Sequence, residues 1–215
     1  MTRSARLAMT VAAALTLGTS AAQAQSPTPA PATDGRYSAE FTAAATLGHT
    51  SASSFGGELD YRVKEQWVGT FEFGRMRNIA NGDLQSRANV IANALQGSAN
   101  ATQKATYYDF GVRYRLAPRG MWHPYLAAGI GAATVTTNTS FQAGNEVTVS
   151  PGADLQGTVT KPLMVIGGGV TVPFLSRYFA DGSYRYGRIF SRSGAIENDK
   201  GINTQRVQIG VGIRF

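Results

Sequence analysis

Val207-Gln-Ile-Gly-Val-Gly-Ile-Arg-Phe215, the last nine residues of the chain, alternate between large apolar side chains and small or polar ones. Neighbouring residues of an extended strand point to opposite faces. One face of this segment therefore carries Val, Ile and Phe, and the other carries Gln, Gly and Arg. Such a pair of faces is typical of a strand that separates lipid from a polar interior. We therefore expect the chain to end on a membrane β-strand.

Seven upstream segments show the same alternation, and each is close to the 9–11 residues that a tilted membrane strand needs. They lie at about residues 37–47, 55–63, 67–77, 106–116, 124–136, 162–172 and 178–189. With the terminal segment they predict an all-β protein, an eight-stranded antiparallel transmembrane up-and-down β-barrel.

The connections between these segments alternate in length. Those at 63–67, 116–124 and 172–178 are short, whereas those at 78–105, 137–161 and 190–202 are long. Bacterial outer-membrane barrels have short periplasmic turns and longer extracellular loops. The alternation predicts that topology, with both termini on the periplasmic side. In the first long loop, apolar residues from Asp83 to Leu95 recur at helical spacing, which predicts a short surface helix.

The N-terminal residues have the three parts of a secretory signal peptide. Arg3 and Arg6 are basic, Leu7–Leu17 is a short apolar run, and Ala22-Gln23-Ala24 matches a cleavage site. We expect residues 1–24 to be a cleaved signal peptide, residues 25–35 a Pro/Ala-rich periplasmic linker, and residues 36–215 the barrel domain.

Charge and composition narrow the function classes. The chain has 20 basic and 13 acidic residues, so loss of Arg3 and Arg6 with the signal peptide leaves a formal charge of +5. The basic residues are spread over strands and loops, and export argues against a nucleic-acid partner, so anionic lipid headgroups are the favoured one. The chain has no cysteine, and an exported domain without disulfides needs a large core or a closed sheet. No spacing of His, Cys or carboxylates suggests a metal, and no cofactor is expected.

The placement of charges predicts which face of each strand meets lipid. The presumed outward positions carry no charge at mid-strand, where one Arg or Lys would cost about 2–4 kcal/mol. Aromatic residues gather toward both strand ends, as expected at two bilayer interfaces. The short-turn group is Tyr37, Tyr61, Trp67, Trp122, Tyr125, Phe174, Tyr178 and Phe215; the long-loop group is Phe55, Phe73, Tyr107, Tyr108, Tyr186 and Phe190.

The opposite face carries the charged residues that are expected to fill the lumen. They are Glu58, Asp60, Arg62, Glu72, Asp109, Arg113, Arg115, Asp181 and Arg185. Two interpretations are open: a paired network that plugs the interior, or a charged channel. The interior of an eight-stranded barrel is just filled by side chains, and unpaired buried charges are costly. Both considerations favour the plug.

Two surface features suggest sites outside the lumen. Arg75, Arg77 and Arg188 are expected to face outward at the long-loop end, where lipopolysaccharide phosphates would lie, and Arg binds phosphate bidentately. Lys104, Lys161, Arg192 and Lys200 lie in the nearby loops. Generic solubility of a loop rim explains the same residues equally well. His49-Thr50-Ser51 could supply a base and a nucleophile, but an ordinary turn is the favoured interpretation, because no acidic partner is evident.

The chain resembles the small outer-membrane barrels of the OmpA/OmpX-like superfamily over about residues 36–215. The likeness rests on Pro124-Tyr-Leu-Ala-Ala-Gly-Ile-Gly131, Tyr184-Arg-Tyr-Gly187 and Gly210-Val-Gly-Ile-Arg-Phe215. It implies location in the bacterial outer membrane. It also implies that the terminal strand, with Val211, Ile213 and Phe215, is the signal recognised by the barrel-assembly machinery during insertion.

The resemblance does not imply one activity, because such barrels serve as anchors, adhesion factors and lipid enzymes. We expect an integral outer-membrane protein with a structural or loop-mediated surface role, a plugged polar lumen and no catalysis. Lipid and lipopolysaccharide are the expected partners, together with an extracellular ligand that the sequence does not identify. The alternatives are a lipid A-modifying enzyme (an acyl hydrolase or transferase) and a narrow pore.

Overall fold

The structure is a computed structural model that describes residues 35–47, 52–80, 82–94, 96–118, 120–142, 157–190 and 201–215. Its elements are β1 (Tyr37–Leu47), β2 (Ala52–Arg62), β3 (Trp67–Met76), α2 (Gly82–Ala94), β4 (Ser98–Arg115), β5 (His123–Gln142), β6 (Gly157–Pro173), β7 (Tyr178–Ile189) and β8 (Ile202–Arg214). The predicted signal peptide and residues 25–34 of the predicted linker lie outside the described residues. Among the described residues, no helix is long and apolar enough to cross a membrane.

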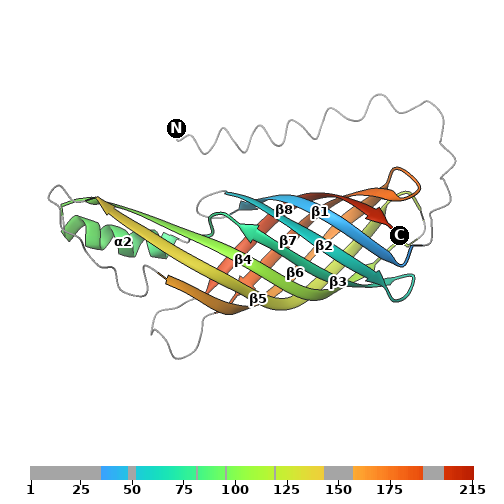
Figure 1. Ribbon diagram of the computed structural model, residues 1–215, viewed down its shortest axis with the longest axis horizontal. Coiled ribbons are helices and arrows are strands. Elements are labelled where there is room, and N and C mark those ends of the chain that lie inside the picture. Colours follow the sequence, from blue (N-terminus) through green and yellow to red (C-terminus); the bar gives the residue numbers. More distant parts are fainter. Residues whose placement is uncertain are drawn as a thin grey trace, which may run out of the picture. The chain divides into compact units, whose positions relative to one another are not determined.

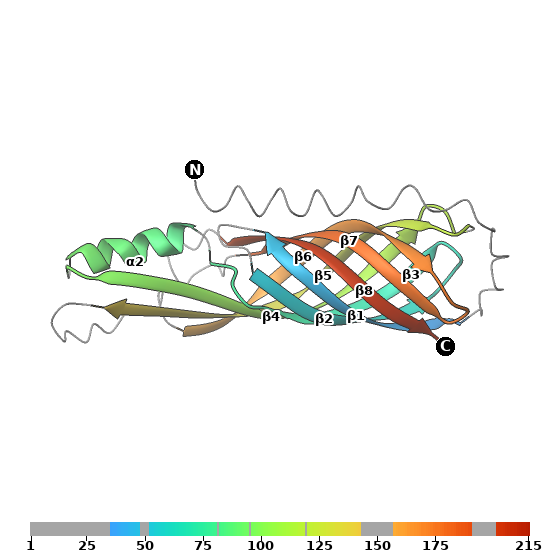
Figure 2. The same cartoon turned by 90° about the horizontal axis from the view of Figure 1, so that it is seen from above.

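The strands form a closed antiparallel barrel in the order β1 to β8 (Figure 1). Every strand pairs with its neighbours in sequence, and β8 closes the barrel by pairing with β1, with Ala39 opposite Ile213 and Ala45 opposite Val207. The two strands lie side by side in both views (Figure 2). Closure leaves no unpaired sheet edge around the wall, which a lipid environment requires. The predicted fold class is confirmed.

Alternation of side chains between the two faces holds along the wall. In β8 every second residue is buried, whereas Val207, Ile209 and Val211 are 48%, 69% and 59% exposed. Outward aromatics pack on one another at the short-turn end, where the Tyr37 ring lies 5.1 Å from Tyr61 and 6.2 Å from Phe215. A wall of exposed Val, Ile and Phe is the surface that a barrel presents to hydrocarbon.

Two aromatic residues do not belong to the interfacial belts in which the sequence interpretation placed them. Tyr107 and Tyr125 were assigned to the interfacial belts, yet each is only 2% exposed and points into the lumen. The strand parity explains the error: in β4 and β5 the odd-numbered residues point inward. Both hydroxyls find lumen carboxylates, at 2.8 Å from Glu72 and Asp181 respectively.

Strands β4, β5 and β6 are longer than predicted. Ladder pairing between β4 and β5 continues to Ser98 opposite Gln142, so parts of the predicted loops 78–105 and 137–161 are strand. Residues 143–156 of the latter loop, and 191–200 of the last one, are outside the described residues. Above the apolar band the outward face of these strands becomes polar, so the apolar alternation fades although the backbone pairing persists.

Helix α2 confirms the predicted surface helix, and it lies along the outer part of β4 (Figures 1 and 2). Ala80, Leu84, Ala88 and Ala101 form a small buried cluster, against which Ile91, Ala99 and Phe141 pack. The edge of β4 is also capped by side chains. Gln85 Nε2 donates to the Ala99 carbonyl at 2.9 Å, and its Oε1 accepts from the Ala101 amide at 3.1 Å.

Candidate functional site

The barrel interior contains most of the charged residues that the sequence assigned to it. Glu58, Asp60, Glu72, Asp109, Arg113, Asp181 and Arg185 are all buried, whereas Arg62 and Arg115 are half-buried at the short-turn end. The strand parity brings them together because every one of these residues occupies an inward position. Seven buried ionisable groups in one interior must be organised by pairing and hydrogen bonds.

Glu58 on β2 is the centre of the largest ion-pair cluster. It accepts from Arg113 of β4, and its second carboxylate oxygen lies 3.1 Å from Arg185 Nη2 of β7. Arg113 Nη1 is also 3.6 Å from Asp60, which accepts a 3.0 Å hydrogen bond from the Ser38 hydroxyl. The cluster therefore ties β1, β2, β4 and β7 together across the lumen.

Tyr125 supports this cluster from β5. The guanidinium carbon of Arg113 lies 4.1 Å from the centre of the Tyr125 ring, a cation–π contact. The Tyr125 hydroxyl donates to Asp181, and the Thr171 hydroxyl donates to the other Asp181 oxygen, each at 2.8 Å. Both oxygens of this buried carboxylate are thus satisfied.

A second cluster joins β3, β4 and β8, and its cation was missed by the sequence interpretation. Arg206 Nη1 lies 2.7 Å from Glu72 Oε1, and both contact the Tyr107 hydroxyl. The Arg206 guanidinium also lies over the Tyr107 ring, at 4.4 Å. Arg206 has the same parity as Gln208 and Arg214, so extending the terminal alternation one step upstream would have identified it.

Glu40 on β1 is a further interior residue that was missed, because its strand is otherwise rich in Ala and Thr. It is 6% exposed. A side chain at Gly210 would overlap the Glu40 carboxylate, and one at Gly212 would overlap the Phe179 ring. The glycines of the terminal strand therefore make room for large inward side chains. One carboxylate oxygen of Glu40 and one of Asp109 have no hydrogen-bond partner.

The long-loop end of the lumen contains an apolar cluster, which the sequence interpretation did not foresee. The buried members of this cluster are Met76, Ile79, Ala105, Tyr107, Ala133, Val135, Leu163, Val165, Ile189 and Ile202. The expected polar lumen is thus polar in its middle and short-turn sections, with an apolar layer above. The sequence interpretation named only the outward residues of β6 and so missed Leu163 and Val165, which are 3% and 2% exposed.

The arginines of the proposed rim lie on two separate parts of the wall. Arg75 and Arg77 belong to β3 and its following turn, whereas Arg188 belongs to β7, four strands away around the barrel. Arg77 lies over the Phe55 ring at 5.7 Å, and Arg188 donates to Asn203 at 2.5 Å. Lys104 on β4 is exposed two residues before Thr106, which is opposite Arg75, whereas Lys161 is half-buried. Arg192, Lys200 and the His49-Thr50-Ser51 segment lie outside the described residues.

Exposed threonines continue the Arg75 row across three strands. Arg75 is opposite Thr106, Thr106 opposite Thr134, and Thr134 opposite Thr160. The Thr134 and Thr160 hydroxyls are 2.9 Å apart, and those of Thr136 and Thr158 are 3.1 Å apart. One row lower on the same face, Tyr108 is opposite Ala132. The wall therefore changes from apolar to polar between these two rows. In the described ranges no group of His, Cys, Asp or Glu is arranged to hold a metal.

Comparison with known proteins agrees with this architecture. Residues 10–215 match the family model of the outer membrane protein beta-barrel domain. Neisserial surface protein A is 15% identical with a TM-score of 0.55, and the match covers 83% of this chain and 96% of that chain. The N-terminal β-barrel domain of Pseudomonas aeruginosa OprF is 17% identical with a TM-score of 0.50, covering 84% and 99%.

The outer membrane enzyme PagL also matches, at 13% identity and a TM-score of 0.42, covering 80% of this chain and 97% of that chain. No curated protein matches this chain. Likeness at such low identity shows the fold alone.

Proposed function

Because the chain belongs to the outer membrane protein beta-barrel domain family, we propose that it is a non-catalytic barrel that presents an ordered hairpin and helix outside the cell. The protein is an integral protein of the bacterial outer membrane. The proposed role is structural and interactive. The closed wall anchors the protein in lipid, the filled lumen stiffens it, and the long-loop end contacts lipopolysaccharide and an extracellular partner.

The observation that carries the surface role is the extension of β4 and β5 beyond the barrel. Pairing from Ser98 opposite Gln142 to Lys104 opposite Thr136 lies above the row at which the wall becomes polar. A membrane anchor does not need this extension, yet helix α2 packs on it and the Gln85 amide caps its edge. Sheet edges invite unwanted pairing unless they are covered, so a covered, ordered extension supports a binding surface.

The polar row at the base of this extension supports contact with lipopolysaccharide. Arg75, Arg77 and Lys104 supply positive charge there, and guanidinium groups match phosphate geometry. The threonine hydroxyls beside them can hydrogen-bond to sugars. Because Arg188 lies on the opposite wall, we expect it to act as a separate and weaker contact.

The test of the surface role compares cells that produce the full chain with cells that produce a variant lacking residues 78–103. We expect the variant barrel to fold, as judged by its heat-dependent gel mobility, while adhesion of the cells to immobilised glycans and matrix proteins falls. The variant Ala88→Glu keeps residues 78–103 but disturbs the packing of α2. It is the matched control that separates loss of order in this segment from loss of the segment itself. Equal adhesion by all three strains would contradict the surface role.

Lipopolysaccharide contact has its own measurement. Replacing Arg75 and Arg77 by Ala together is expected to reduce the lipopolysaccharide that co-purifies with the barrel, with a smaller effect for Arg188→Ala. Unchanged co-purification in the double variant would remove this part of the proposal. A lipid A profile that changes on production of the protein would instead support an enzyme.

A further inference from the structure

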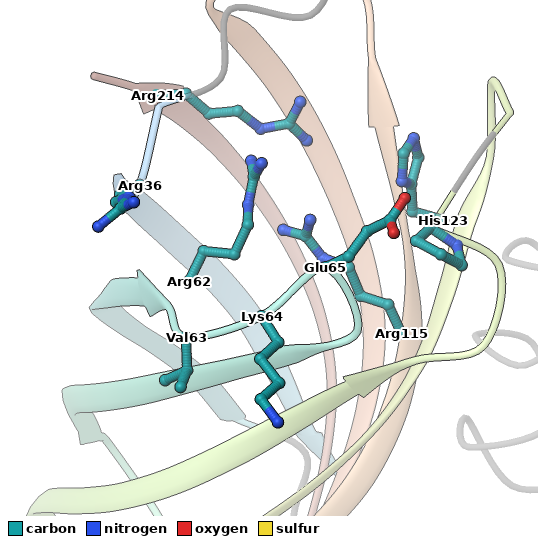
Figure 3. Close-up of a pocket in the computed structure, with 9 residues that line it drawn as sticks. Arg36, Arg62, Val63, Lys64, Glu65, Arg115, His123 and Arg214 are labelled. Atoms are coloured by element: carbon teal, nitrogen blue, oxygen red, sulfur yellow. The ribbon is translucent and has the colours of Figure 1, made fainter.

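A cavity of about 500 Å³ opens at the short-turn end of the barrel (Figure 3). Its charged lining is strongly basic. The lining residues include one carboxylate, that of Glu65, and five cations: Arg36, Arg62, Lys64, Arg115 and Arg214. His123 completes the polar lining. The volume is in the range of small-molecule sites, and the surplus of positive charge indicates an anionic ligand.

The central arginines are held in place by the backbone at the strand ends. The amide of Arg62 donates to the Arg36 carbonyl, that of Arg115 to the Gln66 carbonyl, and that of Arg214 to the Arg177 carbonyl, each at 2.8 Å. Each arginine is therefore anchored where a strand meets a short turn or the chain end. These bonds fix the backbone from which each guanidinium group extends.

Figure 3 shows the guanidinium groups of Arg62, Arg115 and Arg214 directed toward one another across the opening. Glu65 is directed instead toward His123, while Arg36 and Lys64 point away from the centre. The Arg214 guanidinium lies 5.1 Å from the centre of the Phe179 ring, which supports its plane and leaves its N–H groups available at the edge.

Of the four oxygens of the lumen carboxylates Asp60 and Asp181, three accept from donors outside the mouth, and one oxygen of Asp60 has no hydrogen-bond partner. Asp60 accepts from Ser38 and lies 3.6 Å from Arg113, and Asp181 accepts from Tyr125 and Thr171. Convergence of like charges is unfavourable in a partly buried setting. An anion between the three guanidinium groups would offset that repulsion.

We propose that this basic mouth binds a phosphate group. Guanidinium N–H forks match the oxygens of phosphate, and three of them directed to one point suit a tetrahedral oxyanion. The other end of the lumen contains the buried apolar cluster around Leu163 and Val165. The mouth is therefore a cup that receives its ligand from the short-turn side, which faces the periplasm in bacterial barrels. This site is independent of the proposed outer-face role.

Two sources of phosphate fit the geometry. The outward neighbours of the mouth arginines in sequence are aromatic: Tyr37 follows Arg36, Tyr61 precedes Arg62, and Phe215 follows Arg214. Aromatic belts mark the headgroup level of a bilayer, so a lipid headgroup phosphate lies at the height of the mouth. Soluble phosphate compounds reach the same cup from the aqueous side.

The experiment follows the arginine side-chain Nε–H signals by NMR in the folded full chain. One arm titrates inorganic phosphate into the protein in maltoside micelles, with sodium chloride added at matched ionic strength as the reference. The other arm uses maltoside micelles doped with phosphatidylglycerol, with uncharged diacylglycerol as the reference. Each arm is run on the unmodified chain, Arg115→Gln and Arg214→Gln, with Arg75→Gln at the opposite end as the matched control.

Saturable shifts in the phosphate arm are the expected result for a soluble ligand, and shifts confined to the lipid arm assign the site to headgroups. In either case Arg115→Gln and Arg214→Gln should each weaken binding roughly tenfold, since each removes a charged hydrogen-bond donor. Arg75→Gln should leave the affinity unchanged.

Where a Gln variant does not fold, Arg115→Lys is used instead. It keeps the positive charge and should weaken binding less than Arg115→Gln, because only the planar set of guanidinium N–H donors is lost. Absence of saturable shifts in both arms would overturn the proposal. Equal affinity of the unmodified chain and the folded Arg115 variants would also overturn it.

Discussion

At the scale of single residues, Glu58 is the member of the lumen network whose replacement should reduce the stability of the barrel most. It is 2% exposed and contacts both Arg113 and Arg185. Glu58→Ala leaves two buried guanidinium groups without this partner, and breaking a buried ion pair in this way costs about 3–5 kcal/mol. We expect a lower denaturant midpoint for unfolding of the barrel in lipid vesicles. The matched control is Glu65→Ala in an exposed turn, and equal midpoints for the two variants would contradict a structural network.

A lipid-facing residue gives the complementary prediction. Ile130 is 71% exposed at mid-strand, opposite Phe110. Ile130→Arg places a charge against hydrocarbon and should destabilise the folded barrel by about 2–4 kcal/mol. Leu116→Arg, on the same outer surface at the short-turn end, should cost much less. Equal losses of stability would mean that residue 130 does not lie at the bilayer midplane.

Residue parity explains how far the sequence could locate the interior. Wherever a strand alternates clearly between charged and apolar residues, as around Glu58 and Asp60, the inward face was predictable. Arg206 escaped because the residue before it, Gln205, is polar although it faces outward, so the apolar alternation starts only at Val207. The pairing of Glu58 with two arginines could not be predicted, because it depends on the register of four strands around a closed barrel.

At the scale of elements, the β4–β5 extension and helix α2 form one unit joined by side-chain packing. Ala88 is fully buried in their shared cluster. Ala88→Glu introduces a charge there, so α2 should detach from the strand. We expect the amides of residues 99–103 to exchange with solvent about tenfold faster or more, as measured by hydrogen exchange.

The controls for this element separate local from global effects. Exchange at barrel residues such as Val112 and Val165 should not change in the Ala88→Glu variant, because no barrel contact is lost. The exposed Val90→Glu variant, on the same helix, should leave residues 99–103 protected. Protection that persists in Ala88→Glu would show that α2 does not shield the strand.

The sequence could predict that each strand and the helix exist, but it could not predict how long β4 and β5 are. The eight strands and the helix follow from periodicity, since each buries one face. The outer parts of β4 and β5 have polar residues such as Thr102 and Asn138 on their outward face and small residues inward. Hydrogen-bonded pairing and the packing of α2 sustain them there, and neither is visible in the apolar pattern of the strands.

At the scale of the whole molecule, the lumen is layered from end to end: an apolar cluster, two ion-pair clusters, and a basic mouth. This layering predicts a protein that does not conduct. Reconstituted in planar bilayers, the barrel should show no steady current. Glu72→Ala should not create a current, because the apolar layer around Leu163 and Val165 remains intact above the space left by the Glu72 side chain. A stable ohmic conductance in the unmodified protein would contradict a filled lumen.

The claim beneath all of these is that apolar side chains cover the outside of the barrel and charged ones fill its interior. The chain has no cysteine, so single cysteines at successive positions of β8 from Val207 to Ile213 can carry a nitroxide label in lipid bilayers. The decisive measurement is the label's collision rate with dissolved oxygen, which concentrates in hydrocarbon. We predict a period of two, with high rates at residues 207, 209, 211 and 213 and low rates between them. A flat profile, or high rates at residues 208, 210 and 212, would contradict the claim.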